Sequence, residues 1–172
     1  KIKVYDFGLA KELKGLEHTN GKYNLTANTG SWLYMAPEVA KGWKYDFKVD
    51  VYSFAILLWE MLSGKYAYTD MDINETTFRT CVVERGDRPP MIRQWPPEVE
   101  ELLRASWSWN SNQRPSFEEI KEKFASDEFA KYHHEHHRSS SGFFSSLLSG
   151  LAHASTGGTL LKFDVKNGEI EK

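Results

Sequence analysis

The sequence predicts a mainly α-helical domain with one long loop and little β-structure. Residues 49–62 carry apolar side chains on nearly every side of the helix they would form, and such a helix is buried inside a domain. Residues 97–107 begin with a proline suited to a first helical turn and continue with apolar residues at helical spacing. Ser116 precedes Glu119 by three positions, which is the capping-box pattern at the start of another helix.

The chain begins with a pattern typical of a short strand, in which Ile2 and Val4 alternate with charged residues before Gly8. A mostly polar stretch follows over residues 9–34. Loops of this length without secondary structure are uncommon in compact domains, and those that occur usually serve a function. We therefore expect a functional loop that ends at Pro37.

Two of the four main predicted helices lie between this loop and residue 97. The buried helix over 49–62 has a stop signal at Gly64, because glycine readily adopts the left-handed conformation that ends helices. Residues 74–85 form the next predicted helix, which Gly86 closes.

The composition is that of a globular protein: of 172 residues, 40% are hydrophobic and 27% are charged. A formal net charge of −2 offers no general attraction to nucleic acid. The longest apolar run, residues 54–59, is far shorter than the roughly 20 residues that span a bilayer, so we expect no membrane span. Cys81 is the single cysteine, which excludes an internal disulfide and favours a reducing compartment. We therefore expect a cytoplasmic protein.

The composition shifts near residue 129, which divides the chain into two parts. Residues 1–129 hold the predicted helices. Residues 130–172 form a polar tail rich in histidine and serine. The last residues of this tail alternate in polarity around Asn167-Gly168, which predicts a short terminal hairpin.

Two short motifs bracket the long loop. Asp6-Phe7-Gly8 follows the first strand, and Ala36-Pro37-Glu38 closes the loop. The first triplet alone is a weak signal, because such tripeptides arise often by chance. In this order the two motifs resemble the start and end of the activation segment of eukaryotic-type protein kinases. The resemblance implies a truncated large (C-terminal) lobe of a kinase, from the Asp-Phe-Gly motif onward, with a long activation segment.

The resemblance implies a nucleotide-binding role for each residue of the first triplet. Asp6 would bind the Mg²⁺ that bridges the phosphates of ATP, since this hard cation prefers carboxylate oxygens. Phe7 would pack as a hydrophobic anchor that positions Asp6. Gly8 would allow a backbone conformation that is closed to other residues. The alternative is a turn at a strand end with an incidental aspartate.

The residues around Ser31 resemble the family's loop that receives the substrate residue beside the phosphorylated one. A serine or threonine at this position hydrogen-bonds the catalytic loop and is typical of kinases that act on serine or threonine. The alternative is an ordinary polar loop residue.

The motif Gly86-Asp87-Arg88-Pro89 resembles one common in tyrosine kinases and in tyrosine-kinase-like serine/threonine kinases. Together with Ser31, it favours the latter group.

The resemblance also assigns structural roles to three charged residues. Glu38 and Arg114 would form a buried ion pair that ties the activation segment to the helical core. The alternative is two separate surface charges, which the place of Arg114 before Pro115 and a helix cap disfavours. Asp50 would cap the backbone of the catalytic loop, or would be a plain carboxylate at a helix start.

Four hydroxyl groups of the long loop are candidates for phosphorylation: Thr19, Tyr23, Thr26 and Thr29. A phosphate adds roughly −1.5 to −2 charge and would order the loop against basic side chains. The alternative for each residue is ordinary polarity in a solvated loop.

The family's active site has further parts that this sequence lacks: a glycine-rich phosphate loop, an ATP-anchoring lysine with its glutamate partner, and a His-Arg-Asp catalytic loop. We expect the chain to be part of a protein serine/threonine kinase that transfers the γ-phosphate of ATP to protein hydroxyls. ATP and Mg²⁺ would be its cofactors, and a protein substrate would be its partner. Tyrosine specificity stays open. We expect the isolated chain to be inactive, since phosphoryl transfer needs several positioned groups together. The alternative is a degenerate kinase fold that acts as a scaffold or interaction module.

Overall fold

The computed structural model describes residues 7–71 and 74–125. In chain order its elements are β1 (His18–Thr19), β2 (Lys22–Tyr23), a 3₁₀ turn (Trp32–Tyr34), α1 (Pro37–Ala40), α2 (Lys48–Ser63), a 3₁₀ turn (Thr69–Met71), α3 (Glu75–Phe78), a π-helical segment (Arg79–Glu84), α4 (Pro97–Ser106), a 3₁₀ turn (Ser111–Gln113) and α5 (Phe117–Phe124). Helices dominate, and each described strand is two residues long, which confirms the predicted mainly α fold class.

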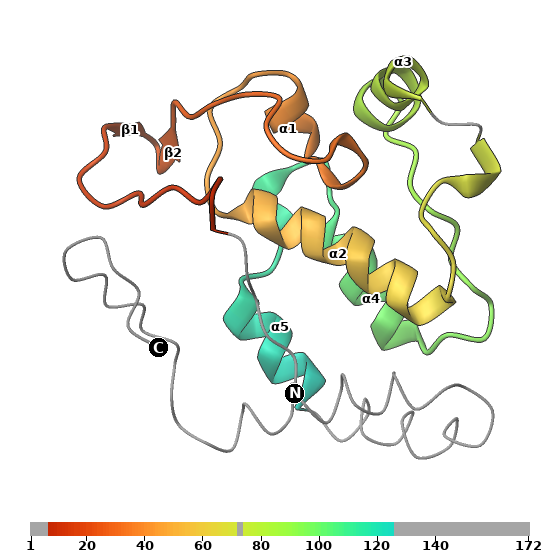
Figure 1. Cartoon of the computed structure of the whole chain (residues 1–172). Coiled ribbons are helices and arrows are strands. Elements are labelled where there is room, and N and C mark those ends of the chain that lie inside the picture. Colours follow the sequence, from red (N-terminus) through yellow and green to blue (C-terminus); the bar gives the residue numbers. More distant parts are fainter. Residues whose placement is uncertain (1–6, 72–73, 126–172) are drawn as a thin grey trace.

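Helix α2 lies at the centre of the described structure, with α1 on one side of it and α4 on the other (Figure 1). The side chains of Tyr52, Ala55 and Ile56 are fully buried and form the middle of the core. Leu102 and Leu103 of α4 belong to the same cluster, because the apolar stripe of α4 packs against α2. The predicted buried helix is therefore confirmed.

One expectation about α2 is wrong. The helix was predicted to be buried on every side, but Leu57 is 45% exposed and Asp50 is exposed as well. These residues are seven positions apart, so they lie on one side of the helix, which is opposite Tyr52. The part of the chain that the structure describes leaves this side open to solvent. The helix ends as predicted at Gly64, whose φ is 67°.

The helix predicted over residues 74–85 is present, but its second half is not α-helical. It begins after Asn74, whose side chain accepts hydrogen bonds from two backbone N–H groups of the first turn. From residue 79 onward the segment is π-helical, and the Arg85 N–H donates to the Thr80 carbonyl at 3.1 Å. Gly86 follows with a φ of 80°, as expected of a helix stop.

The capping box predicted before α5 is confirmed in both directions. The Glu119 N–H donates to the Ser116 hydroxyl at 3.2 Å, and the Ser116 N–H donates to the Glu119 carboxylate at 2.6 Å. These two hydrogen bonds satisfy backbone donors that the first turn of a helix otherwise leaves without partners. The Ser116 hydroxyl also donates to the Glu119 carboxylate at 2.8 Å, and the two hydrogen bonds that this carboxylate accepts from Ser116 lower its pKa, because they favour its charged form.

We expect Ser116→Ala to lower the free energy of unfolding by about 1 kcal/mol, because the cap is lost. The stabilisation that the Glu119 carboxylate contributes is complete above the ordinary glutamate pKa. It is lost as the pH falls through the lowered pKa that Glu119 has in the folded chain. The decrease in the free energy of unfolding caused by Ser116→Ala should therefore be smaller at acidic pH. Urea unfolding at neutral and acidic pH measures both effects. Thr76→Ala removes an exposed hydroxyl that caps nothing, and an equal loss in that control would contradict the prediction.

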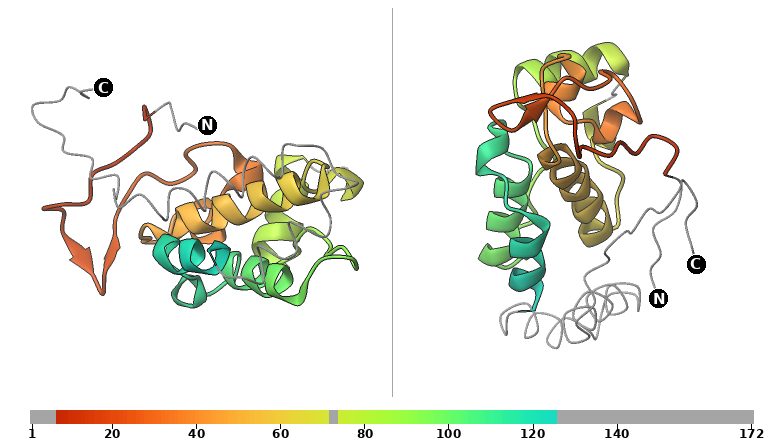
Figure 2. Two further views of the ribbon diagram at one scale, coloured as in Figure 1. Left: turned by 90° about the horizontal axis from the view of Figure 1, so that it is seen from below. Right: turned by 90° about the vertical axis from the view of Figure 1, so that its left-hand side faces the viewer.

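The long loop contains a hairpin that was not predicted. Strands β1 and β2 pair antiparallel, with Thr19 opposite Lys22, and the views of Figures 1 and 2 show them projecting beyond the helices. The two turn residues, Asn20 and Gly21, have φ values of 53° and 75°, and this dipeptide strongly favours such two-residue turns. Tyr23 also exchanges two backbone hydrogen bonds with Tyr45, of 2.9 and 3.1 Å, which hold the hairpin against the chain before α2.

Several predictions concern residues outside the described ranges: the first strand, the boundary near residue 129, the polar tail 130–172 and its terminal hairpin. Among the described helices, none has the length and apolar character needed to cross a bilayer.

Candidate functional site

Glu38 and Arg114 form the predicted ion pair. The two terminal nitrogens of Arg114 donate to the two carboxylate oxygens of Glu38 at 2.5 and 2.9 Å. The Arg114 side chain is completely buried, and only 9% of the Glu38 side chain is exposed. This is the planar, two-point geometry in which a guanidinium binds a carboxylate most strongly. The alternative of two separate surface charges is excluded.

Arg114 also joins segments that are distant in sequence. Its Nε donates to the Ser108 carbonyl at 2.9 Å, and a terminal nitrogen donates to the Lys48 carbonyl at 3.1 Å. In return, the Lys48 ammonium donates to the Arg114 carbonyl at 2.6 Å. One buried side chain therefore connects α1, which closes the long loop, to the start of α2 and to the turn before α5.

The motif Gly86-Asp87-Arg88-Pro89 has a structural role in this core. The Arg88 guanidinium donates to the carbonyls of Val82 and Trp107, both at 3.1 Å. The guanidinium carbons of Arg88 and Arg114 lie 5.0 and 5.2 Å from the centroid of the buried Tyr52 ring. Cation–π contacts of this kind help a buried arginine to replace the water it has lost.

A chain of hydrogen bonds holds the residues after Ser31 against α2. The Tyr34 hydroxyl donates to one carboxylate oxygen of Glu60 at 2.8 Å, and the Ala67 N–H donates to the other at 2.8 Å. The Ser53 hydroxyl donates to the Tyr34 carbonyl at 2.8 Å. Burial and the bond to Glu60 raise the pKa of Tyr34 to about 12, so its phenol stays neutral and remains a donor at physiological pH.

Ser31 itself is exposed at the start of the 3₁₀ turn Trp32–Tyr34. Its hydroxyl makes no hydrogen bond within the described ranges, and its carbonyl accepts from the Tyr34 N–H at 3.2 Å. The predicted hydrogen bond of Ser31 to a catalytic loop stays a prediction.

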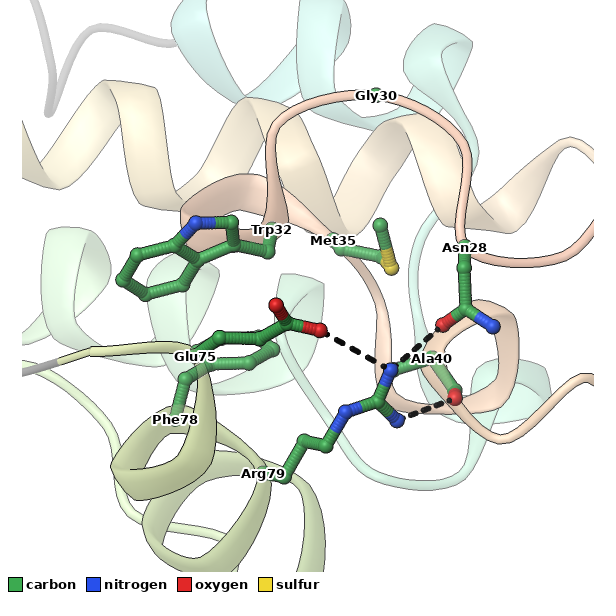
Figure 3. Close-up of a pocket in the computed structure, with 8 residues that line it drawn as sticks. All are labelled: Asn28, Gly30, Trp32, Met35, Ala40, Glu75, Phe78 and Arg79. Atoms are coloured by element: carbon green, nitrogen blue, oxygen red, sulfur yellow. Dashed lines mark hydrogen bonds and ion pairs between the residues drawn. The ribbon is translucent and has the colours of Figure 1, made fainter.

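A pocket of about 200 Å³ lies beside this turn (Figure 3). Its lining combines the long loop, α1 and the α3 region: Asn28, Gly30, Trp32, Met35, Ala40, Glu75, Phe78 and Arg79. Trp32 and Phe78 meet edge to face with ring centroids 5.3 Å apart and form an apolar wall.

The polar side of the pocket is organised by Arg79. Its guanidinium donates to the Ala40 carbonyl and to the side-chain oxygen of Asn28, both at 3.1 Å, and lies 3.5 Å from the Glu75 carboxylate (Figure 3). These contacts fix the long loop against the α3 region. Sequence reasoning missed Asn28, Phe78 and Arg79, because no spacing rule brings together residues about fifty positions apart.

The predicted metal ligand, Asp6, lies outside the described residues. Phe7 is 43% exposed, and its predicted role beside Asp6, like that of Gly8, stays a prediction. Within residues 7–71 and 74–125, no group of three or more His, Cys, Asp or Glu side chains could hold a metal ion.

Asp50 lies in the first turn of α2, as the simpler of its two interpretations predicts. Although the residue as a whole is exposed, its carboxyl is partly desolvated by the surrounding chain, and this raises its pKa. Its side chain has no hydrogen-bond or ion-pair partner within the described ranges, so the proposed capping of a catalytic loop stays a prediction. Phe47 holds the N-cap position of the helix without a side-chain hydrogen bond.

The four candidate phosphorylation sites differ in their surroundings. Thr19 is exposed, and its hydroxyl accepts a hydrogen bond from the Lys44 ammonium at 3.0 Å. Tyr23 is half-buried in β2, Thr26 is exposed, and the Thr29 hydroxyl donates to a backbone carbonyl of its own loop. Thr19 is therefore the candidate whose hydroxyl already contacts a basic group.

The helical lobe around α2, with a buried Glu38–Arg114 pair locking a long loop onto it, defines the class as the large lobe of a protein kinase. The sequence model of the family described as protein tyrosine and serine/threonine kinase matches residues 1–124. The chain belongs to this family, which confirms the resemblance predicted from its motifs, including that to the tyrosine-kinase-like serine/threonine kinases.

Several curated relatives resemble the chain. Serine/threonine-protein kinase VIK of Arabidopsis thaliana is 41% identical over 134 residues, which cover 73% of this chain and 30% of that protein. Serine/threonine-protein kinase STY46 of the same plant is 36% identical over 157 residues, or 90% of this chain and 26% of that protein. Human mitogen-activated protein kinase kinase kinase 7 is 38% identical over 120 residues, or 69% of this chain and 18% of that protein. The chain thus spans less than a third of each of these relatives.

Proposed function

We propose that the chain supplies the magnesium-binding and substrate-docking parts of a protein serine/threonine kinase, which transfers the γ-phosphate of ATP to protein hydroxyls. The family membership supports this proposal, and the observation that carries it is the anchored loop around Ser31. The Glu38–Arg114 pair and the Tyr34–Glu60 bond hold this loop from two sides. A fixed loop beside a pocket is what a substrate polypeptide needs in order to present its hydroxyl in one place.

Asp6 would hold Mg²⁺ and, with Phe7 and Gly8, would contact the nucleotide. One carboxylate fits this task, because Mg²⁺ in phosphoryl-transfer sites usually takes one or two carboxylates and completes its octahedron with phosphate oxygens and water. When bound, Mg²⁺ neutralises charge on the transferred phosphoryl group.

The pocket between the long loop and α3 would receive a side chain of the protein substrate near the phosphorylated residue. Trp32, Met35 and Phe78 offer apolar contacts on one side, and Arg79 closes the other. The exposed Ser31 would join this loop to the catalytic loop of the complete site.

Thr19 is the phosphorylation site we favour within the long loop, because Lys44 would pair with its phosphate. The single cysteine supports a reducing, intracellular site of action.

A chimera tests this function. Residues 1–124 of the chain replace the matching region of the Arabidopsis relative VIK, and the purified protein is incubated with labelled ATP and casein. We expect transfer to serine or threonine, and its loss in Asp6→Ala, where circular dichroism shows an unchanged fold. A folded chimera that transfers nothing would contradict the proposal and favour the scaffold alternative.

The 172-residue chain alone serves as the second arm. We expect no measurable transfer from it, because the sequence holds no His-Arg-Asp catalytic loop and no glycine-rich phosphate loop. Clear phosphorylation of casein by the isolated chain would show that its own residues complete an active site.

A further inference from the structure

We infer that a surface distinct from the substrate pocket binds an acidic peptide segment of a partner protein. This surface, called the double-tryptophan face here, consists of Trp43, Trp109, Lys22, Lys41 and Lys44. It shares no residue with the pocket lining, and the inference does not depend on the proposed kinase activity.

Two exposed indoles form the apolar part of the face. Trp43 is 53% exposed and Trp109 is 43% exposed, although they come from loops more than sixty residues apart. Their rings meet edge to face, with centroids 6.4 Å apart and an interplanar angle of 88°. Tryptophan is the residue type most often found where a protein interface gains most of its binding energy. A packed pair of indoles left open to solvent therefore indicates a contact surface.

Lys41 crosses both indoles. Its ammonium lies 4.8 Å from the centroid of the Trp43 ring and 4.5 Å from that of the Trp109 ring. Cation–π contacts at this distance hold the charge in place over the apolar surface. The face thus presents a positive group directly beside exposed aromatic area.

The hairpin adds two further ammonium groups to the same surface. Lys22 stands opposite Thr19 in the strand register, so the two side chains point to one face of the hairpin. Lys44 donates to the Thr19 hydroxyl at 3.0 Å, and Lys22 donates to the Ser111 hydroxyl at 3.0 Å. Because Lys44 follows Trp43 and Ser111 lies two residues after Trp109, these contacts join the lysines to the indole pair.

These lysines lack acidic partners. The ammonium groups of Lys22, Lys41 and Lys44 contact hydroxyls or aromatic rings, and none forms an ion pair with a carboxylate in the part of the chain that the structure describes. The ion pairs there use other basic residues: Arg79, Arg85, Arg104, Arg114 and Lys121. Three uncompensated positive charges beside exposed indoles complement a segment that carries both carboxylates and apolar side chains. The chain's net charge of −2 disfavours a longer polyanion such as nucleic acid.

The inference is tested with the full 172-residue chain and a fluorescein-labelled peptide composed of Asp, Glu and Leu. Fluorescence anisotropy should show saturable binding that weakens as salt is added, since exposed charges are screened. A peptide with Asn and Gln in place of the acids should bind at least about tenfold more weakly, which corresponds to 1.4 kcal/mol.

Variants locate the site. The triple variant Lys22→Gln/Lys41→Gln/Lys44→Gln and the single variant Trp109→Ala should each weaken binding by about tenfold. A matched triple variant at exposed lysines elsewhere, Lys11→Gln/Lys14→Gln/Lys65→Gln, should bind as the parent does. Circular dichroism melting of each variant separates lost binding from lost folding.

Three results would overturn the inference. The first is the absence of saturable binding by the acidic peptide, and the second is an equal loss in the two triple variants. The third is binding of a single-stranded DNA oligonucleotide as tightly as the peptide, with the same dependence on the three lysines. That last result would make the face a general anion-binding surface.

Discussion

Replacing Arg114 with alanine is expected to lower the free energy of unfolding by about 3–5 kcal/mol. The substitution leaves the Glu38 carboxylate buried without its guanidinium, and it also removes the donors to the carbonyls of Ser108 and Lys48. A buried charge without a partner is among the few defects that reach this size. Because Arg114 joins α1, α2 and the turn before α5, the loss should lower the stability of the whole lobe.

Urea unfolding followed by circular dichroism measures this loss. Arg104→Ala is the matched control, since Arg104 pairs with Glu100 on the exposed surface of α4, and we expect a loss of about 0.5 kcal/mol or less. The double variant Glu38→Leu/Arg114→Met removes both charges and should recover much of the stability, because an apolar pair often replaces a buried ion pair at little loss. An Arg114→Ala chain within about 1 kcal/mol of the parent would show that this pair contributes little.

Phe78→Ala is expected to lower the free energy of unfolding by about 3–5 kcal/mol. The Phe78 side chain is 1% exposed and belongs to the core cluster, so its removal leaves a cavity that the packed surroundings refill only in part. It also removes the edge-to-face partner of Trp32 in the wall of the pocket. The substitution should therefore loosen the loop after Ser31 as well as the core.

The same urea experiment measures the stability of Phe78→Ala. Because the chain has six tryptophans, the part of the fluorescence that a Trp32→Phe substitution removes reports on the surroundings of Trp32. Phe117→Ala is the control, because Phe117 is exposed and meets Phe54 edge to face with ring centroids 5.6 Å apart. We expect a loss of about 0.5–1.5 kcal/mol there. Equal losses in the two variants would mean that Phe78 does not support the core as its burial indicates.

Much of the fold follows from local patterns in the sequence. The apolar periodicity of residues 49–62, the capping box at Ser116 and the glycine stops at Gly64 and Gly86 each predict an element that the structure contains. Such signals are reliable because helix caps and amphipathic stripes depend on residues within a few positions of one another. The hairpin at Asn20-Gly21 carried an equally local signal and was overlooked.

Other features were beyond such reasoning. The π-helical hydrogen bonding after Phe78 has no simple sequence pattern. The exposure of Leu57 depends on what covers one side of α2, because periodicity shows which residues are apolar but not which side is covered.

The sequence alone determined the kinase family and the main helices, because motif residues and helix signals are readable one segment at a time. The partnership of Glu38 with Arg114 followed from the family resemblance, since the two residues are 76 positions apart. The tertiary structure alone decided where Arg79 meets Asn28 and where Trp43 meets Trp109. Those contacts join positions 51 and 66 residues apart, and they form only when separate helices and loops have packed around α2. The contacts that form the pocket and the double-tryptophan face therefore depend on how the helices and loops pack together, which no local sequence pattern encodes.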